Sequence, residues 1–118
     1  MRLAAEQGNP FAPFHLGTLY SNGRGVPQDY TEAANWYRLA AEQGHADAQF
    51  ILGGMYRDGT GVIQSYIDAH MWFNIAASAG NESAKGNRDR VATEMSQDDL
   101  VRAQRLAREC LERGYKDC

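Results

Sequence analysis

The chain has 118 residues, of which 43% are hydrophobic, and its formal net charge at pH 7 is -3. This length fits one globular unit, and the slightly acidic balance argues against a nucleic-acid footprint. The sequence shows no run of about 18 apolar residues and no charged-then-apolar leader at its start, so it predicts no membrane insertion.

A short segment recurs along the chain and divides it into units. RLAAEQG occurs at residues 2–8 and again at 38–44, and a weaker copy, NIAASAG, follows at 74–80, so the period is 36 residues. A fixed period of this length is typical of a solenoid. The predicted units of one continuous domain are the end of a truncated repeat (1–8), a first repeat (9–44), a second repeat (45–80) and a divergent repeat with a capping helix (81–118).

The first repeat is predicted to form two helices joined by a shaped turn. Apolar side chains at spacings of two to four predict a helix over residues 10–21, with its prolines in the first turn, where they are tolerated. In the next segment, NGRGVPQDY, Gly23 and Gly25 permit positive φ and Pro27 prevents the helix from continuing. A second helix is predicted over 31–43, followed by a glycine that suits a helix C-cap.

The second repeat copies this pattern, with helices predicted over 46–57 and 67–79 around the turn DGTGVIQSY. Gly17 and Gly53 lie at equivalent positions inside the first helices, where glycine costs about 1 kcal/mol relative to alanine. We interpret the repeated glycine as a close crossing between helices. Aromatic side chains among the alanines of the second helices are predicted to fill the core; they are Trp36, Tyr37, Trp72 and Phe73.

The third unit begins as a helix, predicted over 82–95, but it lacks the glycine-rich turn. Ser96, with a carboxylate three residues on, indicates the start of another helix. From residue 97 to 113 the apolar side chains form one stripe, and arginines and glutamates occupy the other side. A helix with one polar face is what a solenoid needs as its terminal cap.

Two cysteines, Cys110 and Cys118, lie near the end of the chain. Two are too few for a disulfide framework, and their spacing does not match a zinc or redox motif. They fit a buried thiol on the last helix and a loose terminal thiol. A bridge is the alternative; it requires the chain to turn back after Gly114, and it would indicate an exported protein.

The pattern A-x-x-x-L-G-x-x-Y-x-x-G-x-G-V-x-x-D-Y-x-x-A-x-x-W-Y-x-x-A-A-E-Q-G, from Ala12 to Gly44, resembles the Sel-one-like repeat (SLR) family, whose units are related to tetratricopeptide repeats. The resemblance covers nearly the whole chain. It weakens at Ser65, which stands where the first repeat has Asp29, and in the third unit. It implies an all-α fold, a right-handed α-solenoid of helix-turn-helix repeats with a C-terminal capping helix.

The resemblance also implies a protein-protein interaction adaptor, such as bacterial members provide in envelope, signalling or host-interaction complexes. The first helices would line a concave groove that binds a peptide or partner protein. Aligned on the Leu-Gly pair, the groove positions are Phe11, Phe14, His15, Thr18, Ser21 and Asn22, then Asp47, Phe50, Ile51, Gly54, Arg57 and Asp58, then Asn87, Arg90, Thr93 and Glu94. An apolar strip beside arginines would suit an extended peptide with hydrophobic anchors and an acidic group.

These groove residues also have structural explanations. Phe14 and Phe50 recur at one repeat position, so they fit the core as well as an exposed groove. Arg57 and Arg90 fit solvated surface charges better than ligand clamps, since exposed ion pairs contribute little.

No catalytic or metal-binding constellation stands out. His15, His45 and His70 fall at unrelated repeat positions, and none has a second histidine or cysteine three or four residues on, so we expect no metal site and no cofactor. His70 replaces an alanine of a second helix and is interpreted as a hydrogen-bonded packing residue. The turns lack the lysine of a phosphate-binding loop, and the S-x-x-K signature of penicillin-recognising enzymes is absent. We therefore predict that the protein is not an enzyme.

Two other functions stay open beside the adaptor. The chain is alternatively the C-terminal capping part of a longer scaffold with its binding site upstream, or, by family analogy, a weak hydrolase or cell-wall-binding protein. A severed repeat at the start predicts fraying or weak self-association through the exposed N-terminal repeat face. A periplasmic or secreted location is expected only with an upstream signal peptide.

Overall fold

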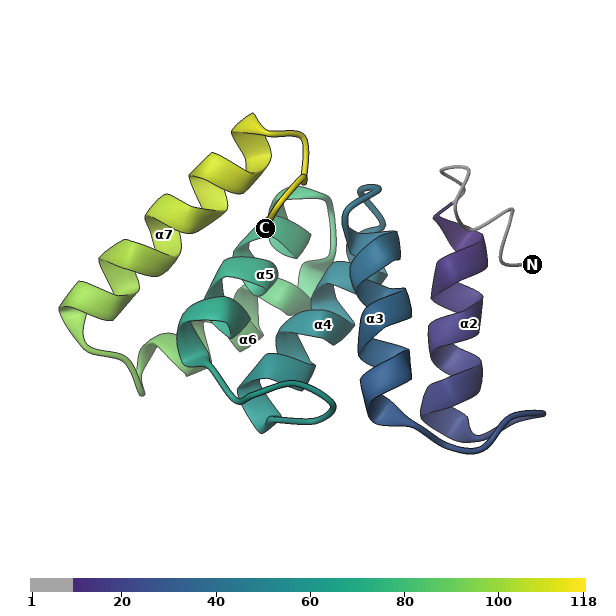
Figure 1. Cartoon of the computed structure of the whole chain (residues 1–118). Coiled ribbons are helices and arrows are strands. Elements are labelled where there is room, and N and C mark those ends of the chain that lie inside the picture. The colour runs from purple at the N-terminus through teal and green to yellow at the C-terminus, as the bar shows by residue number, and fades with distance from the viewer. Residues whose placement is uncertain (1–9) are drawn as a thin grey trace.

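The computed structural model describes residues 10–118, and this part of the chain consists of α-helices without a strand (Figure 1). The helices are α2 (Phe11–Asn22), α3 (Tyr30–Ala41), α4 (Ala46–Asp58), α5 (Tyr66–Ser78), α6 (Glu82–Ala92) and α7 (Gln97–Glu112). The predicted all-α repeat solenoid is confirmed. The truncated repeat with the first copy of RLAAEQG, and the fraying or self-association expected there, lie outside the described residues.

Side-chain caps set the start of the helices from α3 to α7. In each, the residue before the helix accepts a hydrogen bond from the backbone N–H three residues on, over 3.0 to 3.1 Å. The capping residues are Asp29, His45, Ser65, Asn81 and Ser96. The cap predicted at Ser96 is confirmed, and Ser65 keeps the capping function of Asp29 although it departs from the family pattern.

Two helices end two or three residues earlier than predicted because their last turns tighten. α6 ends at Ala92 rather than at Met95, and the N–H groups of residues 93–95 bond to carbonyls three residues back. In the same way, α3 ends at Ala41 rather than at Gln43.

The two helices of each repeat cross closely at a glycine. A Cβ atom at Gly17 would lie 2.9 Å from the ring of Tyr37, and one at Gly53 would lie 2.8 Å from the ring of Phe73. Both rings are buried and packed, so neither can move aside freely. The predicted close crossing is therefore confirmed.

The glycine-rich turn of the second repeat contacts the first repeat. Gly61 has a φ of +75°, and a Cβ atom there would overlap the carbonyl of Tyr30, the first residue of α3. Its equivalent, Gly25, has a φ of +78° but no atom within 4 Å of the Cβ position. Gly61 is therefore required both by its backbone conformation and by repeat stacking, whereas Gly25 is required by conformation alone.

Three of the four aromatic residues predicted for the core are buried. The exposed fractions of Tyr37, Trp72 and Phe73 are 4%, 0% and 1%. The prediction is wrong for Trp36, which is only partly buried. Its counterpart Trp72 shares a core cluster with residues of α7, whereas Trp36 borders a hollow lined by side chains of α3 itself.

The end of the chain folds back and is covalently closed. After Gly114, which has a φ of +63°, the chain reverses (Figure 1). A disulfide joins Cys118 to the fully buried Cys110. Tyr115 packs against the main core, and a Cβ atom at Gly44 would lie 3.3 Å from its ring. The interpretation as two separate thiols is therefore wrong, and the bridged alternative holds. The disulfide fastens the tail to α7, and Tyr115 packs at the corner between α3 and α4.

Candidate functional site

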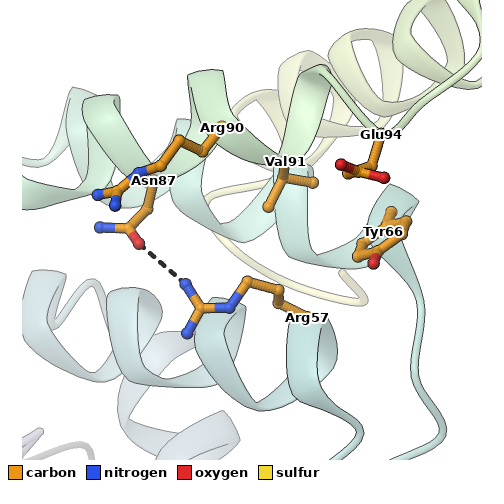
Figure 2. A pocket seen from close by; sticks show the side chains of 6 residues that line it. All are labelled: Arg57, Tyr66, Asn87, Arg90, Val91 and Glu94. Atoms are coloured by element: carbon orange, nitrogen blue, oxygen red, sulfur yellow. Dashed lines mark hydrogen bonds between the residues drawn. The ribbon is translucent and has the colours of Figure 1, made fainter.

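A pocket of about 160 Å³ lies where α4 approaches α6 (Figure 2). We call it the α4–α6 pocket. Its lining residues are Arg57, Tyr66, Asn87, Arg90, Val91 and Glu94. Figure 2 shows Arg57 rising from α4 toward Asn87 of α6, with Tyr66 and Glu94 at the opposite end from Arg90. The pocket therefore has a cationic end and an end that carries a carboxylate and a phenol.

The guanidinium group of Arg57 is held on three sides. Its Nε and Nη2 atoms donate to the carboxylate of Asp58 over 3.0 and 3.2 Å, and Nη1 donates to Oδ1 of Asn87 over 2.9 Å. The guanidinium carbon also lies 5.8 Å from the ring centroid of Phe73. The hydrogen bond between the charged groups lowers the pKa of Asp58 and raises the pKa of Arg57. Arg57 is therefore oriented before any ligand arrives.

Arg90 is less constrained than Arg57. It is exposed, and its Nε atom makes one long bond, of 3.5 Å, to the carbonyl oxygen of Gly86 within the same helix. Figure 2 shows its side chain extending beside Asn87, so it can approach a ligand bound at Arg57.

The predicted apolar strip is partly absorbed into the core. Phe14 and Ile51 are half-buried against the main core cluster, and Phe50 is half-buried against the second cluster. The ring centroid of Phe50 lies 5.7 Å from that of Phe73, the ring beneath Arg57. Phe14 and Phe50 are thus neither fully in the core nor fully exposed.

Consecutive first helices meet at the N-cap of the later helix. His45 caps α4, and its ring stacks on Phe14 with centroids 4.4 Å apart while Phe11 meets it edge-on at 5.4 Å. At the equivalent joint, Asn81 caps α6 and donates from Nδ2 to Oδ1 of Asp47 over 3.0 Å. The first joint is therefore aromatic and the second is polar.

The other predicted groove residues are scattered along this surface. Phe11 is 68% exposed, and His15 and Asn22 are exposed as well. Thr18 is half-buried, with its hydroxyl 3.1 Å from the hydroxyl of Tyr37. The structure thus brings Arg57, Asp58 and Arg90 together and leaves the α2 residues outside this pocket.

Two pocket residues were not predicted. Tyr66, like its equivalent Tyr30, stands at the first position of a second helix, and recurrence at one repeat position indicates packing rather than binding. Val91 is a buried residue between Arg90 and the α6 terminus. Val91 follows Arg90, a predicted groove residue, and this neighbourhood is the one sequence feature that could have indicated Val91.

Between residues 10 and 118 no group of three or more His, Cys, Asp or Glu side chains is placed to hold a metal ion. Nor does a helix in this range combine the length and apolar character needed to cross a bilayer.

Comparisons with known proteins identify the repeat. The family described as Sel1 repeat matches residues 10–45 and 46–81. The crystal structure of c5321, a protective antigen of uropathogenic Escherichia coli strains with an SLR fold, is similar at a TM-score of 0.89 and 34% identity, covering 97% of this chain. A Sel1 repeat protein from Oxalobacter formigenes is similar at a TM-score of 0.72 and 43% identity, covering 75% of this chain and 67% of its own.

The chain spans only 26% of the length of the Escherichia coli protein. The comparison with curated proteins found no match.

Proposed function

Because the chain belongs to the Sel1 repeat family, whose repeats are commonly protein-protein interaction modules, we propose that the α4–α6 pocket binds an extended segment of a partner protein. The segment carries an acidic group, which meets Arg57 and Arg90. Next to that group it carries an apolar side chain, which contacts Val91 and the exposed part of Phe50, two members of one apolar cluster. Scaffolds of this family are typically non-catalytic, and we propose no reaction for this chain.

The orientation of Arg57 is the observation that carries this proposal. Asp58 and Asn87 use its Nε atom and one N–H of each terminal nitrogen, and Phe73 supports one side of the plane. The remaining N–H groups have no bond to another described residue and are available to a carboxylate. An arginine that is fixed in advance loses little conformational entropy on binding. Its planar guanidinium group favours a planar anion such as a carboxylate.

The charges along the pocket give the bound segment a direction. Arg57 and Arg90 attract a negative group at one end, whereas Glu94 repels it at the other end beside Tyr66. A segment whose acidic residue is followed by a neutral or basic residue would match both ends. The reversed order would place like charges together.

The test is a selection of random peptides displayed on phage against the immobilised chain. We expect enriched peptides to share an acidic residue beside an aromatic or aliphatic one. The double variant Arg57→Gln, Arg90→Gln should weaken binding of these peptides by roughly tenfold or more, the scale of losing a charge-assisted contact. The matched control is Arg102→Gln, Arg105→Gln, which removes two exposed charges from α7 and should leave binding unchanged.

Enrichment of peptides without an acidic residue, or equal binding by both double variants, would contradict the proposed site. Circular dichroism of each variant should show unchanged helix content. A loss of binding then reports on the pocket itself.

A second candidate function is supported by the length comparison. The chain matches about a quarter of the Escherichia coli protein, and one side of α3, around Trp36, borders an open hollow. We propose as the alternative that the chain caps a longer repeat scaffold. Selections that return no peptide on this chain, but return peptides on a longer natural chain that contains it, would favour this alternative.

The disulfide supports a proposal about location. Bridges such as Cys110–Cys118 persist in oxidising environments and are rare in reducing ones. We therefore propose a periplasmic or secreted protein. The test is labelling of free thiols on the chain in its native host. If both cysteines react with the reagent, the bridge is absent there, and the proposed location is contradicted.

A further inference from the structure

A second pocket, of about 290 Å³, lies between α5, α6 and α7 and shares no residue with the α4–α6 pocket. We call it the histidine pocket. Its lining residues are His70, Asn74, Arg88, Asp89, Ala92, Leu100 and Gln104.

Comparison of equivalent positions, 36 residues apart, explains why this space exists. In the first repeat, Arg38 of α3 reaches across to donate a hydrogen bond to the hydroxyl of Tyr56 on α4. The equivalent residues are Asn74 on α5 and Ala92 on α6. These side chains are much shorter, so the space that the earlier pair fills is left open.

The third unit also places charges at positions that are apolar in the second. The counterpart of Leu52, which is fully buried, is Arg88, and the counterpart of the tightly packed Gly53 is Asp89. Arg88 donates from Nη1 to Oδ1 of Asn74 over 3.0 Å and pairs with Asp89 over 3.1 Å. A core position of the repeat has thus become part of a polar site.

His70 forms the buried wall of this pocket. It is 3% exposed, and its Nδ1 atom is buried without a hydrogen-bond partner among the described residues. The predicted burial is confirmed, whereas the predicted hydrogen bond is not found for Nδ1. Burial lowers the pKa of His70, and the charge of Arg88 lowers it further while Asp89 raises it. An unpartnered buried nitrogen is costly and calls for a specific explanation.

We propose that the histidine pocket binds a small anion that bears a carboxylate or phosphate group. Arg88 would supply the positive charge, and the amide of Gln104 and the imidazole of His70 would supply further donors. Asp89 competes for the same guanidinium, but its side chain is 61% exposed and can turn into solvent. Because the anion stabilises the protonated imidazole, binding should strengthen as the pH falls.

The test is an NMR titration of the labelled chain with sodium succinate and with inorganic phosphate, at ionic strength held constant with chloride. We expect saturable shifts at the His70 ring, the Arg88 Nε–H and the Gln104 amide. Saturation with succinate alone, with phosphate alone or with both supports the site and identifies its anion class. Shifts that grow equally with chloride, or never saturate, would overturn it.

Variants separate this site from the α4–α6 pocket. Arg88→Gln should weaken anion binding by roughly tenfold or more, whereas Arg90→Gln, on the same helix but in the other pocket, should not change it. If Arg88→Gln does not fold, Asp89→Asn provides an independent test, because removing the competing carboxylate should tighten binding. Unchanged or weaker binding by a folded Asp89→Asn would count against the proposal.

Discussion

Gly53 of α4 passes so close to Phe73 of α5 that an added Cβ atom would lie 2.8 Å from Cδ1 of the ring. Phe73 is 1% exposed, so the ring has no free space to enter. We expect Gly53→Ala to lower the free energy of unfolding by about 1 to 2 kcal/mol, because the overpacking exceeds the gain in helix propensity. Urea unfolding followed by circular dichroism measures this difference.

The control is Gly86→Ala in α6, where no atom lies within 4 Å of the Cβ position. This variant should be more stable than the natural chain by up to about 1 kcal/mol, since only propensity changes. A Gly53→Ala protein as stable as Gly86→Ala would show that the two helices can separate without loss.

The two turn glycines provide a matched pair. Gly25→Ala should lower stability by about 1 to 2 kcal/mol through its left-handed backbone alone. Gly61→Ala has the same backbone strain, and its methyl group would in addition overlap the carbonyl of Tyr30, so its loss should be clearly larger. Thermal unfolding of both variants measures the difference. Equal losses would mean that the contact between the second turn and α3 contributes nothing.

Reduction of the disulfide should loosen the end of the chain. A bridge closing so short a loop contributes about 2 to 3 kcal/mol in the chain-entropy treatment. We therefore expect dithiothreitol to shift the urea midpoint of the natural chain downward and to leave Cys118→Ser unaffected. Two titratable thiols in the native, unreduced protein would contradict the bridge.

His70 should make stability depend on pH. Its pKa in the folded chain is lowered from an ordinary 6.5, chiefly by burial, so the unfolded chain takes up the proton at a higher pH than the folded chain. The free energy of unfolding should therefore fall as the pH drops below about 6.5, by no more than about 1.4 kcal/mol per pH unit for one proton. The loss should level off once folded His70 is itself protonated.

The matched comparison uses two histidine variants in urea unfolding between pH 8 and pH 5. His70→Gln should remove this part of the pH dependence, while His15→Gln, at an exposed position, should retain it. Identical pH profiles for the two variants would contradict the assignment to His70.

Much of the fold could be predicted because it repeats. Gly17 and Gly53 marked the helix crossing because a costly helical glycine recurs at one repeat position. Ser96 marked the start of α7 because an N-cap acts through local backbone geometry. The sequence could offer the bridge only as an alternative, because it depends on a chain reversal after Gly114 that no spacing rule describes. Trp36 was misplaced for a related reason: burial of a repeat residue depends on a neighbouring helix as well as on its own position.

The candidate site could be predicted only in part. Alignment with related repeats assigned Arg57 and Arg90 to one groove, and both residues line the α4–α6 pocket. It could not show that Asp58, Asn87 and Phe73 together orient Arg57, because these contacts join three different helices. The half-burial of Phe50 likewise follows from the position of Phe73 on α5 rather than from the residues around Phe50.

The two joints between first helices limit how this array could be rebuilt. His45 completes a joint whose other half, Phe14, belongs to the preceding repeat, and Asn81 does the same for Asp47. Copying one 36-residue block would therefore transfer only one residue of each contacting pair. That residue would then face a residue other than its natural partner. A design that lengthens or recombines the array should therefore transfer Phe14 together with His45, and Asp47 together with Asn81.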